Sequence, residues 1–482
     1  MPLIDSLPGD RVLFLGIGGS GMSSLAHILL DLGFGVLGYD KKSSDITDFL
    51  SERGAKIRND LSGIETKDFD FIVYSSAVND KNHSVYKEVQ AFAKPMFHRS
   101  DVLHRVFERG KSISVAGSHG KTSTTAMVSQ ILETEKKDPT IMIGGDTALL
   151  GKRGGKAGKG EWGVYESDES DGTFLKHSAN IRIATNVDND HLDHYGDRQK
   201  LEVAFQSYLG PLLPGHAIVQ GQDPGIQSVL ARIATEPTFS KNFHLWILLP
   251  SFWDVSDSLL KELKLKLGDR LHLIHFQFEE DRLNVKVSEV RFQLNLPFSG
   301  THYLLNGLCA ATAAFIAGIE WEKSASILSE YVGVKRRQEV LGVKDGITVM
   351  DDYGHHPTEI KTVIESIQNS KKGNGKLVVL FQPHRYTRTD LLQKELAEAL
   401  SSSEVLYLLP IYTAGEKEIP GVSTSTIAKH IIALEPKVLS GNIEEDLTLI
   451  RKSIAHGDIL LCLGAGNVRS WGEAFLEEKK AG

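Results

Sequence analysis

The stretch Ser112-Ile-Ser-Val-Ala-Gly-Ser-His-Gly-Lys-Thr-Ser-Thr-Thr125 decides how the middle of this chain folds. An apolar run of strand length leads into a glycine-containing loop, and a threonine-rich segment then opens a helix. Gly120-Lys121-Thr122 offers backbone donors, a lysine for the β- and γ-phosphates of a triphosphate, and a hydroxyl for Mg²⁺. The first glycine of a standard G-x-x-x-x-G-K-[ST] loop would fall at Val115, and Gly117 comes two residues later. We therefore predict a variant ATP-binding loop, with an incidental turn as the alternative.

Outward from this stretch, strand-length apolar runs alternate with helix-length amphipathic segments, which is typical of an α/β fold with mainly parallel sheets. The pattern restarts three times, so we expect domains at residues 1–110, 111–332 and 333–482. Residues 243–298 are aromatic and alternating, which predicts antiparallel strands added to the second block. The strands expected elsewhere lie at residues 11–16, 36–40, 71–74, 112–116, 163–166, 181–186, 347–350, 377–381, 405–409 and 459–463.

Composition limits the function classes. The 482 residues include 54 basic and 62 acidic side chains, a net charge of −8 that offers no general attraction to nucleic acid. We find neither a signal-peptide layout nor an apolar stretch of about 18 residues, the length of a membrane span. Cys309 and Cys462 lie in apolar runs, which predicts buried, reduced thiols. We expect a cytoplasmic protein without a nucleic-acid or membrane partner, and its oligomeric state is left open.

A second glycine-rich loop, Gly16-Ile-Gly-Gly-Ser-Gly21, follows a predicted strand and opens a predicted helix. Such a loop lets the backbone approach a pyrophosphate at a helix N-terminus. Asp40 ends the next strand, where its carboxylate could accept a hydrogen bond from a ribose hydroxyl. The pattern fits NAD or FAD, another nucleotide diphosphate, or a plain turn. A chain with both loops favours an ATP-consuming enzyme that acts on a nucleotide-linked substrate over a dehydrogenase.

Acidic residues follow two strands of the second block. Glu166 ends the strand at residues 163–166 and is the best candidate for a Mg²⁺ ligand, since Mg²⁺ on phosphates needs only one or two protein carboxylates. Further candidates near the phosphates are Asp168, Glu169, Asp171, Asp190, His191 and Asp193. The glycine- and lysine-rich residues 151–160 are interpreted as a mobile surface loop, or else as a lid over a polyanionic substrate.

The third block carries three polar motifs: Lys335-Arg-Arg337, Asp351-Asp-Tyr-Gly-His-His-Pro357 and Gln382-Pro-His-Arg-Tyr-Thr-Arg388. Arg385 and Arg388 are spaced so that their guanidinium groups could grip a carboxylate. Paired aspartates and histidines at a strand end are unusual on structural grounds, because neither type prefers the core. We expect a functional site here, with a surface turn as the alternative.

Together these motifs resemble the Mur ligases, which are ATP-dependent amide ligases of bacterial cell-wall synthesis. The resemblance rests on Gly16-Ile-Gly-Gly-Ser-Gly-Met22, Gly117-Ser-His-Gly-Lys-Thr122, Glu166-Ser-Asp-Glu-Ser-Asp171, Asp190-His-Leu-Asp193, Asp351-Asp-Tyr-Gly-His-His-Pro-Thr-Glu359 and Pro383-His-Arg-Tyr-Thr-Arg388. It implies an N-terminal Rossmann-like domain for the UDP moiety, a central ATPase domain and a C-terminal Rossmann-like domain. Within the family it favours members that join L-alanine to the carboxylate of UDP-N-acetylmuramate through an acyl phosphate.

The resemblance also implies site residues. Lys121 would hold the ATP phosphates, Thr122 and Glu166 would bind one Mg²⁺, and His191 a second. Other positions implied to contact ATP are Gly117, Ser118, His119, Gly120, Ser123, Asn306, Arg337 and Asp352. Positions expected to bind the UDP substrate are Gly16, Gly18, Gly19, Ser20, Gly21 and Asp40. His355, Arg385 and Arg388 would lie near the amino acid and the product phosphate, and either His191 or His355 could deprotonate the ammonium group.

Three other functions compete. One is a recycling ligase that adds a preformed murein peptide to the same nucleotide sugar. A second is a nucleotide-sensing protein without catalysis, suggested by Tyr303, which replaces a residue that the family associates with ATP. The third is an NAD-dependent dehydrogenase, which would rest on residues 16–21 and Asp40 alone.

Overall fold

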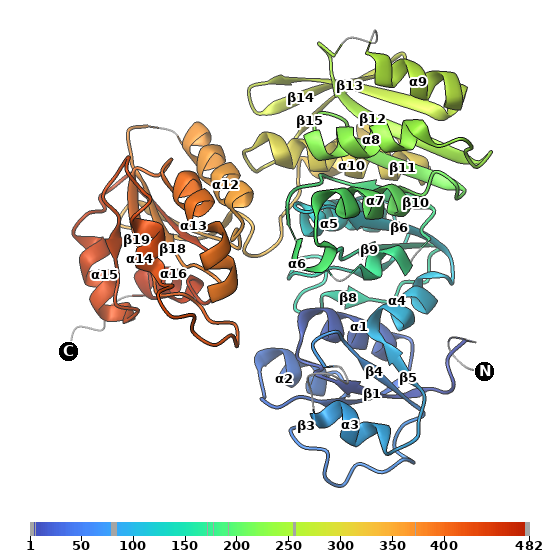
Figure 1. The fold of residues 1–482 in the computed structure, drawn as a ribbon, viewed down its shortest axis with the longest axis horizontal. Coiled ribbons are helices and arrows are strands. Elements are labelled where there is room, and N and C mark those ends of the chain that lie inside the picture. Colours follow the sequence, from blue (N-terminus) through green and yellow to red (C-terminus); the bar gives the residue numbers. More distant parts are fainter. Residues whose placement is uncertain are drawn as a thin grey trace. The chain divides into compact units, whose positions relative to one another are not determined.

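The computed structural model describes residues 4, 6–78, 84–170, 172–176, 178–190, 192–253, 257–371 and 373–477. The chain forms two compact units, one of residues 1–297 and 303–332 and the other of residues 298–302 and 333–482. The first unit holds two sheets and the second unit holds one. The α/β fold with three sheets, expected from the sequence, is confirmed (Figure 1).

The N-terminal sheet has five parallel strands in the order β3-β2-β1-β4-β5. Its strands are β1 (Arg11–Leu15), β2 (Gly35–Tyr39), β3 (Lys56–Arg58), β4 (Phe71–Tyr74) and β5 (Met96–His98). Its helices are α1 (Ser20–Asp31), α2 (Asp45–Glu52), α3 (Ser84–Gln90) and α4 (Arg99–Phe107). The strand order reverses between β1 and β4, and ligands of open α/β sheets bind outside the carboxyl ends of strands at such a point.

The central sheet has ten strands in the order β15-β14-β13-β12-β11-β10-β6-β9-β7-β8. They are β6 (Lys111–Ala116), β7 (Thr140–Met142), β8 (Gly155–Lys156), β9 (Trp162–Glu166), β10 (Ile181–Ala184), β11 (Gly215–Gln220), β12 (Phe243–Pro250), β13 (Leu271–Glu279), β14 (Arg282–Val287) and β15 (Val290–Asn295). Its helical elements are α5 (Lys121–Thr134), η1 (Thr173–Lys176), α6 (Leu192–Tyr195), α7 (Arg198–Leu209), α8 (Pro224–Thr235), α9 (Ser258–Leu267), η2 (Gly268–Arg270), α10 (Thr301–Ile316) and α11 (Trp321–Leu328).

The antiparallel region is smaller than the sequence predicted. β12 pairs in parallel with β11, and β13 pairs in parallel with β12. Among the strands of residues 243–298, the pairs β13-β14 and β14-β15 are antiparallel. Helix α9 separates β12 from β13 and supplies the crossover that parallel neighbours need. The expectation of antiparallel strands from residue 243 onward was therefore wrong for β12 and its pairing with β13, and is confirmed for the pairing of β13 with β14 and of β14 with β15.

The interpretation of residues 151–160 as a mobile loop was also wrong. Residues 155 and 156 form β8, which pairs with β7 and lies beside α1 (Figure 1). A Cβ added at Gly155 would lie 2.1 Å from the carbonyl oxygen of Ser24, so the missing side chain permits this close approach. The backbone N–H of Ala157 also donates to Asp31 at 3.1 Å. These contacts fix the segment against the N-terminal sheet domain.

The sheet of the second unit has the order β16-β17-β21-β18-β19-β20, with only β16 antiparallel. Its strands are β16 (Glu339–Lys344), β17 (Ile347–Asp352), β18 (Leu377–Phe381), β19 (Val405–Leu408), β20 (Lys437–Val438) and β21 (Ile459–Leu463). Its helices are α12 (Pro357–Ser370), α13 (Tyr386–Leu400), α14 (Thr424–Ala428), α15 (Ile443–Arg451) and α16 (Arg469–Leu476).

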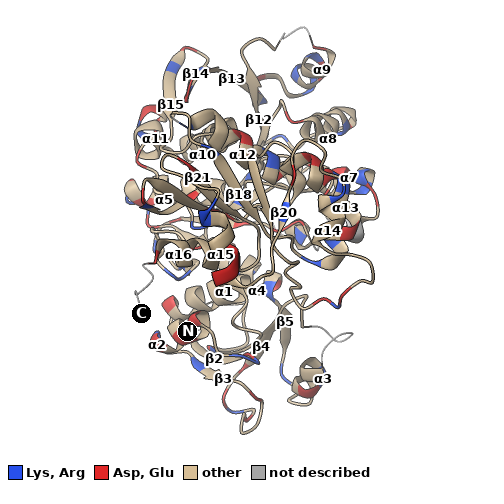
Figure 2. Ribbon diagram, turned by 90° about the vertical axis from the view of Figure 1, so that its left-hand side faces the viewer, with Lys and Arg blue, Asp and Glu red and all other residues tan. Residues whose placement is uncertain are grey.

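The structure can be compared with what composition indicated about the cysteines, the charged residues and membrane spans. Cys309 and Cys462 are free and buried, as predicted. Basic side chains outnumber acidic ones on α7 and α9 (Figure 2): α7 carries Arg198, Lys200 and Glu202, and α9 carries Lys261, Glu262, Lys264 and Lys266. Within the described ranges, every helix is too short or too polar to cross a bilayer.

Candidate active site

The loop between β6 and α5 has the backbone of a phosphate cradle. Gly117 has φ 137° and Gly120 has φ 81°, both in the region that favours glycine. A Cβ at Gly117 would lie 2.0 Å from Oγ1 of Thr185, and one at Gly120 would lie 2.8 Å from Nδ2 of Asn306. Both glycines are therefore required by conformation and by space. The loop ends at the N-terminus of α5, where free N–H groups favour anions.

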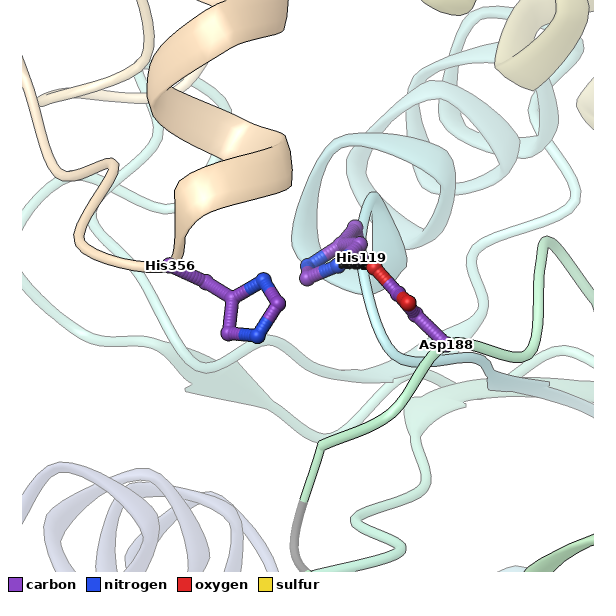
Figure 3. A group of neighbouring side chains, drawn as sticks. All are labelled: His119, Asp188 and His356. Atoms are coloured by element: carbon purple, nitrogen blue, oxygen red, sulfur yellow. Dashed lines mark hydrogen bonds and ion pairs between the residues drawn. The ribbon is translucent and has the colours of Figure 1, made fainter. Parts of the chain in front are cut away.

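Residues that follow β10 hold this loop in place. Oγ1 of Thr185 donates to the carbonyl of His119 at 2.6 Å, and Oδ1 of Asn186 accepts from the N–H of His119 at 2.8 Å. Oγ of Ser118 accepts from the N–H of Asp188 at 2.9 Å. The His119 ring lies against the Asp188 carboxylate, with Nε2 and Oδ2 3.1 Å apart (Figure 3). Sequence analysis placed Ser118 and His119 in the loop but missed the three residues that brace it.

Lys121 is the first residue of α5, and its ammonium group contacts the loop that precedes the helix. Nζ donates to the carbonyls of Gly117 at 2.6 Å and Ser118 at 3.2 Å, and to Oε1 of Glu169 at 2.8 Å. Burial lowers the pKa of Lys121, but Glu169 and the neighbouring carboxylates outweigh burial and raise it, so the lysine is charged. Ser123 is buried in the first turn of α5. The cation expected at the phosphate loop is thus in place.

Thr122 and Glu166 lie together, as the sequence predicted for a metal pair. Oγ1 of Thr122 donates to Oε1 of Glu166 at 3.2 Å, and Oε2 of Glu166 accepts from the N–H of Gly144 at 3.0 Å. A hydroxyl and a carboxylate beside a phosphate loop are the oxygen donors that Mg²⁺ takes when it bridges phosphates. The residues present therefore fit Mg²⁺. His191, predicted for a second metal, lies outside the described residues, as does Asp171.

Asn306 reaches the same loop from α10. It is 4% exposed and its Oδ1 accepts from Nε2 of Gln220 at 3.1 Å. Its amide lies against Gly120, as the space around that glycine shows. Tyr303, one turn earlier on α10, is buried. Gln220 ends β11 and was not predicted, although its position at a strand end was a usable signal.

The second glycine loop, residues 16–21, lies at the carboxyl end of β1. Gly16 has φ 74°, and Gly19 caps α1, which starts at Ser20. Oδ2 of Asp40 accepts from the N–H of Gly18 at 2.9 Å, so this carboxylate braces the loop. A Cβ at Gly21 would lie 1.8 Å from a guanidinium nitrogen of Arg99. These contacts bring together all the residues predicted to bind the nucleotide sugar.

Arg99 and His98 are additions that sequence reasoning missed. His98 ends β5 and Arg99 begins α4, on the other side from β2 of the point where the strand order reverses. Nε2 of His98 lies 3.1 Å from Oγ of Ser76, which follows β4. A guanidinium beside a glycine loop at a helix N-terminus suits a pyrophosphate. The sequence signal that could have found them is the position of Ser76 and of His98-Arg99 at the ends of two strands.

In the second unit, Asp352 ties together the two loops that hold predicted residues. Its Oδ2 accepts from the N–H of Gln338 at 2.8 Å, next to Arg337, and its Oδ1 accepts from the N–H of Gly354 at 2.7 Å, next to His355. Burial raises the pKa of Asp352 to about 6 against the opposing charge of Arg337. The carboxylate therefore positions both neighbours through backbone contacts.

His355 is partly buried and lies among charged groups. Burial lowers its pKa to about 4, Glu359 opposes this shift, and Arg388 adds to it. Nδ1 of His355 lies 3.4 Å from Oε2 of Glu359, and a guanidinium nitrogen of Arg337 lies 3.9 Å from Oε1 of the same carboxylate. A neutral imidazole at pH 7 can accept a proton.

Arg385 and Arg388 begin α13 at the carboxyl end of β18. Arg385 has φ 69°, and its N–H donates to the carbonyl of Tyr412 at 2.9 Å. Arg388 lies 3.4 Å from Nδ1 of His384, whose ring stacks on Tyr412. The two arginines lie at this edge of the sheet, and their joint grip on a carboxylate stays a prediction.

Comparison with known proteins places the chain among the ligases that its motifs resemble. Three family descriptions match it: Mur ligase family, catalytic domain, at residues 11–111; Mur ligase middle domain, at residues 115–314; and Mur ligase, glutamate ligase domain, at residues 336–466. The chain belongs to the Mur ligase family.

The chain is also similar to individual members over nearly its full length. It is 38% identical over 476 residues to the UDP-N-acetylmuramate–L-alanine ligase of Dictyoglomus turgidum, covering 98% of this chain and 97% of that protein. It is 37% identical to the enzyme of the same name from Desulforamulus reducens, covering 97% and 98%. The crystal structure of the UDP-N-acetylmuramate-alanine ligase of Thermotoga maritima has the same fold, with a TM-score of 0.75 at 24% identity over 97% of this chain and 98% of that one.

Proposed function

We propose that this protein is an ATP-dependent ligase that joins L-alanine to the carboxylate of UDP-N-acetylmuramate, releasing ADP and phosphate, in peptidoglycan precursor synthesis. The observation that carries the proposal is the phosphate loop with Lys121, Thr122 and Glu166 converging on it. Relatives that are 37 and 38% identical bear this activity in their names and support the choice of substrates. A cytoplasmic location agrees with two cysteines that stay unpaired.

In this proposal each of the three sheet domains binds a different substrate. Residues 1–110 bind the UDP moiety through the loop at residues 16–21, braced by Asp40. Residues 111–332 bind ATP through the loop at residues 117–123 together with Asn306. Residues 333–482 bring the amino acid, with Arg337 and Asp352 on the ATP side and Arg385 and Arg388 toward the carboxylate or the released phosphate.

The chemistry follows from the groups present. A carboxylate is a poor acyl donor, so its oxygen attacks the γ-phosphorus and forms an acyl phosphate while ADP leaves. Lys121 neutralises charge on the phosphates during this step. Thr122 and Glu166 would hold Mg²⁺, which when bound would supply further charge neutralisation. The neutral amine of alanine then attacks the acyl carbon and phosphate departs. Either His355, whose pKa burial lowers to about 4 so that it is a weak base, or His191 could accept the ammonium proton of alanine.

The test is ADP release by the purified protein with UDP-N-acetylmuramate, ATP and Mg²⁺. L-alanine, glycine, L-serine and a cell-wall tripeptide are offered separately, and mass spectrometry identifies the product. We expect the alanyl product to form fastest. A tripeptide product in place of it would establish the recycling ligase, and binding of ATP without any product would establish a nucleotide-sensing protein. Lys121→Met should abolish turnover and leave binding of the UDP substrate intact.

A further inference from the structure

Glu169 forms an ion pair with Lys121, the lysine of the phosphate loop. The ammonium group of Lys121 has three N–H donors. All three have acceptors: the carbonyls of Gly117 and Ser118 and the carboxylate of Glu169. A phosphate oxygen can therefore accept a hydrogen bond from Nζ only when Nζ breaks its hydrogen bond to one of these acceptors.

Of the three acceptors, Glu169 is the one that a triphosphate must displace. The two carbonyls are neutral and belong to the loop that surrounds the phosphates, whereas Glu169 is an acid whose charge would repel them. Its side chain is 1% exposed and that of Lys121 is 14% exposed, so water screens the ion pair weakly. A buried, charge-assisted contact of this kind competes strongly with a phosphate.

Two hydrogen bonds hold the backbone of Glu169 in place. The hydroxyl of Tyr195 donates to the carbonyl of Glu169 at 2.5 Å, and the N–H of Gly172 donates to the same oxygen at 3.1 Å. Tyr195 lies on α6 and so ties the acidic segment to another element. Lys121 can change partner by rotating its side chain, while the backbone of Glu169 stays in place.

We infer that Glu169 is a positioning residue that competes with ATP for Lys121, so that nucleotide binding exchanges the Lys121–Glu169 ion pair for a Lys121–phosphate contact. The inference rests on the proposed function, because it assumes that the loop binds ATP. Glu169 thereby lowers the affinity for ATP and keeps a buried lysine paired while the site is empty. Removing its charge should tighten nucleotide binding.

The experiment measures the Kd of the nonhydrolysable analogue AMP-PNP with Mg²⁺ by calorimetry, for wild type, Glu169→Gln, Lys121→Met and the double variant. Gln is isosteric with Glu, and we expect Glu169→Gln to bind about tenfold tighter, the scale of one charge-assisted hydrogen bond. Glu169→Ala serves as a second variant and should shift the Kd in the same direction. Glu135→Gln removes one charge from the far end of the α5 region and should leave the Kd unchanged.

The double variant separates competition from general repulsion. If Glu169 acts through Lys121, then Lys121→Met should bind weakly and adding Glu169→Gln should change its Kd little. Tightening of the same size in both backgrounds would overturn the inference, as would weaker binding by Glu169→Gln in the Lys121 background. If the wild type does not bind AMP-PNP with Mg²⁺, the proposed function itself fails. Binding by the wild type with no tightening in Glu169→Gln refutes only the role of Glu169.

Discussion

A row of histidines across three strands of the central sheet should make the first unit sensitive to acid. His216 on β11 lies opposite His244 on β12, and His272 on β13 lies opposite Trp246. The indole N–H of Trp246 donates to Nδ1 of His216 at 3.1 Å, and Nδ1 of His244 lies 3.2 Å from Nε2 of His272. The Trp246 and His272 rings stack with centroids 3.9 Å apart. The hydrogen bond from Trp246 requires a neutral imidazole at His216, because Nδ1 of His216 must accept it.

Burial lowers the pKa values of His216 and His272 from 6.5 to about 4, with neighbouring imidazoles as the next cause. The unfolded chain therefore binds more protons than the folded chain below pH 6.5, so stability falls as pH falls from 6.5 toward 4. Between pH 7.5 and 5.0 the linkage relation gives a loss of about 2 kcal/mol for each of the two imidazoles. Burial also lowers the pKa of His244, which adds in the same direction.

The perturbation is His272→Phe, which keeps the ring stacked on Trp246 and removes the titrating group. The free energy of unfolding is measured by urea titration followed by circular dichroism at pH 7.5 and 5.0. The variant should lose about 2 kcal/mol less than wild type over this interval. His430→Phe, at an exposed histidine, is the matched control and should not change the difference. If the losses of stability between pH 7.5 and 5.0 agree within about 0.5 kcal/mol for wild type and His272→Phe, the reasoning is refuted, because additive effects scatter by about that amount.

Three further changes test the sites. Gly117→Ala places a methyl group 2.0 Å from Oγ1 of Thr185 at φ 137°, so we expect AMP-PNP binding to weaken about 100-fold, a strain cost of a few kcal/mol, while circular dichroism stays unchanged. Glu166→Gln should raise the Mg²⁺ concentration for half-maximal ADP release about tenfold or more, because an ionic ligand is lost; an unchanged Mg²⁺ requirement would argue against this ligand. Arg99→Ala should weaken binding of UDP-N-acetylmuramate about tenfold without altering the Kd of AMP-PNP, because Arg99 lies beside Gly21 in the loop that we propose for the first ligand.

Much of the architecture was predictable because its signals are local. Residues 71–74, 377–381 and 459–463 were predicted as strands and form β4, β18 and β21 with those bounds. Buried parallel strands are continuous apolar runs, and a glycine loop before a helix marks a phosphate cradle in the chain itself. The pairing of Thr122 with Glu166 was implied by the resemblance to the Mur ligases, because no local signal shows that β6 and β9 are neighbours in the sheet.

The tertiary structure alone decided which distant residues complete each site. The bracing of the phosphate loop by Asn186 and the approach of Arg99 to Gly21 depend on strand order, which no local pattern carries. The same holds for residues 151–160, where glycine and lysine composition is typical of a mobile loop but close packing against α1 orders the backbone. Sequence determined the elements and the chemistry that each one carries, because both depend on neighbouring residues. Which of these residues meet was decided by packing, because contacts across a sheet join segments that lie far apart in the chain.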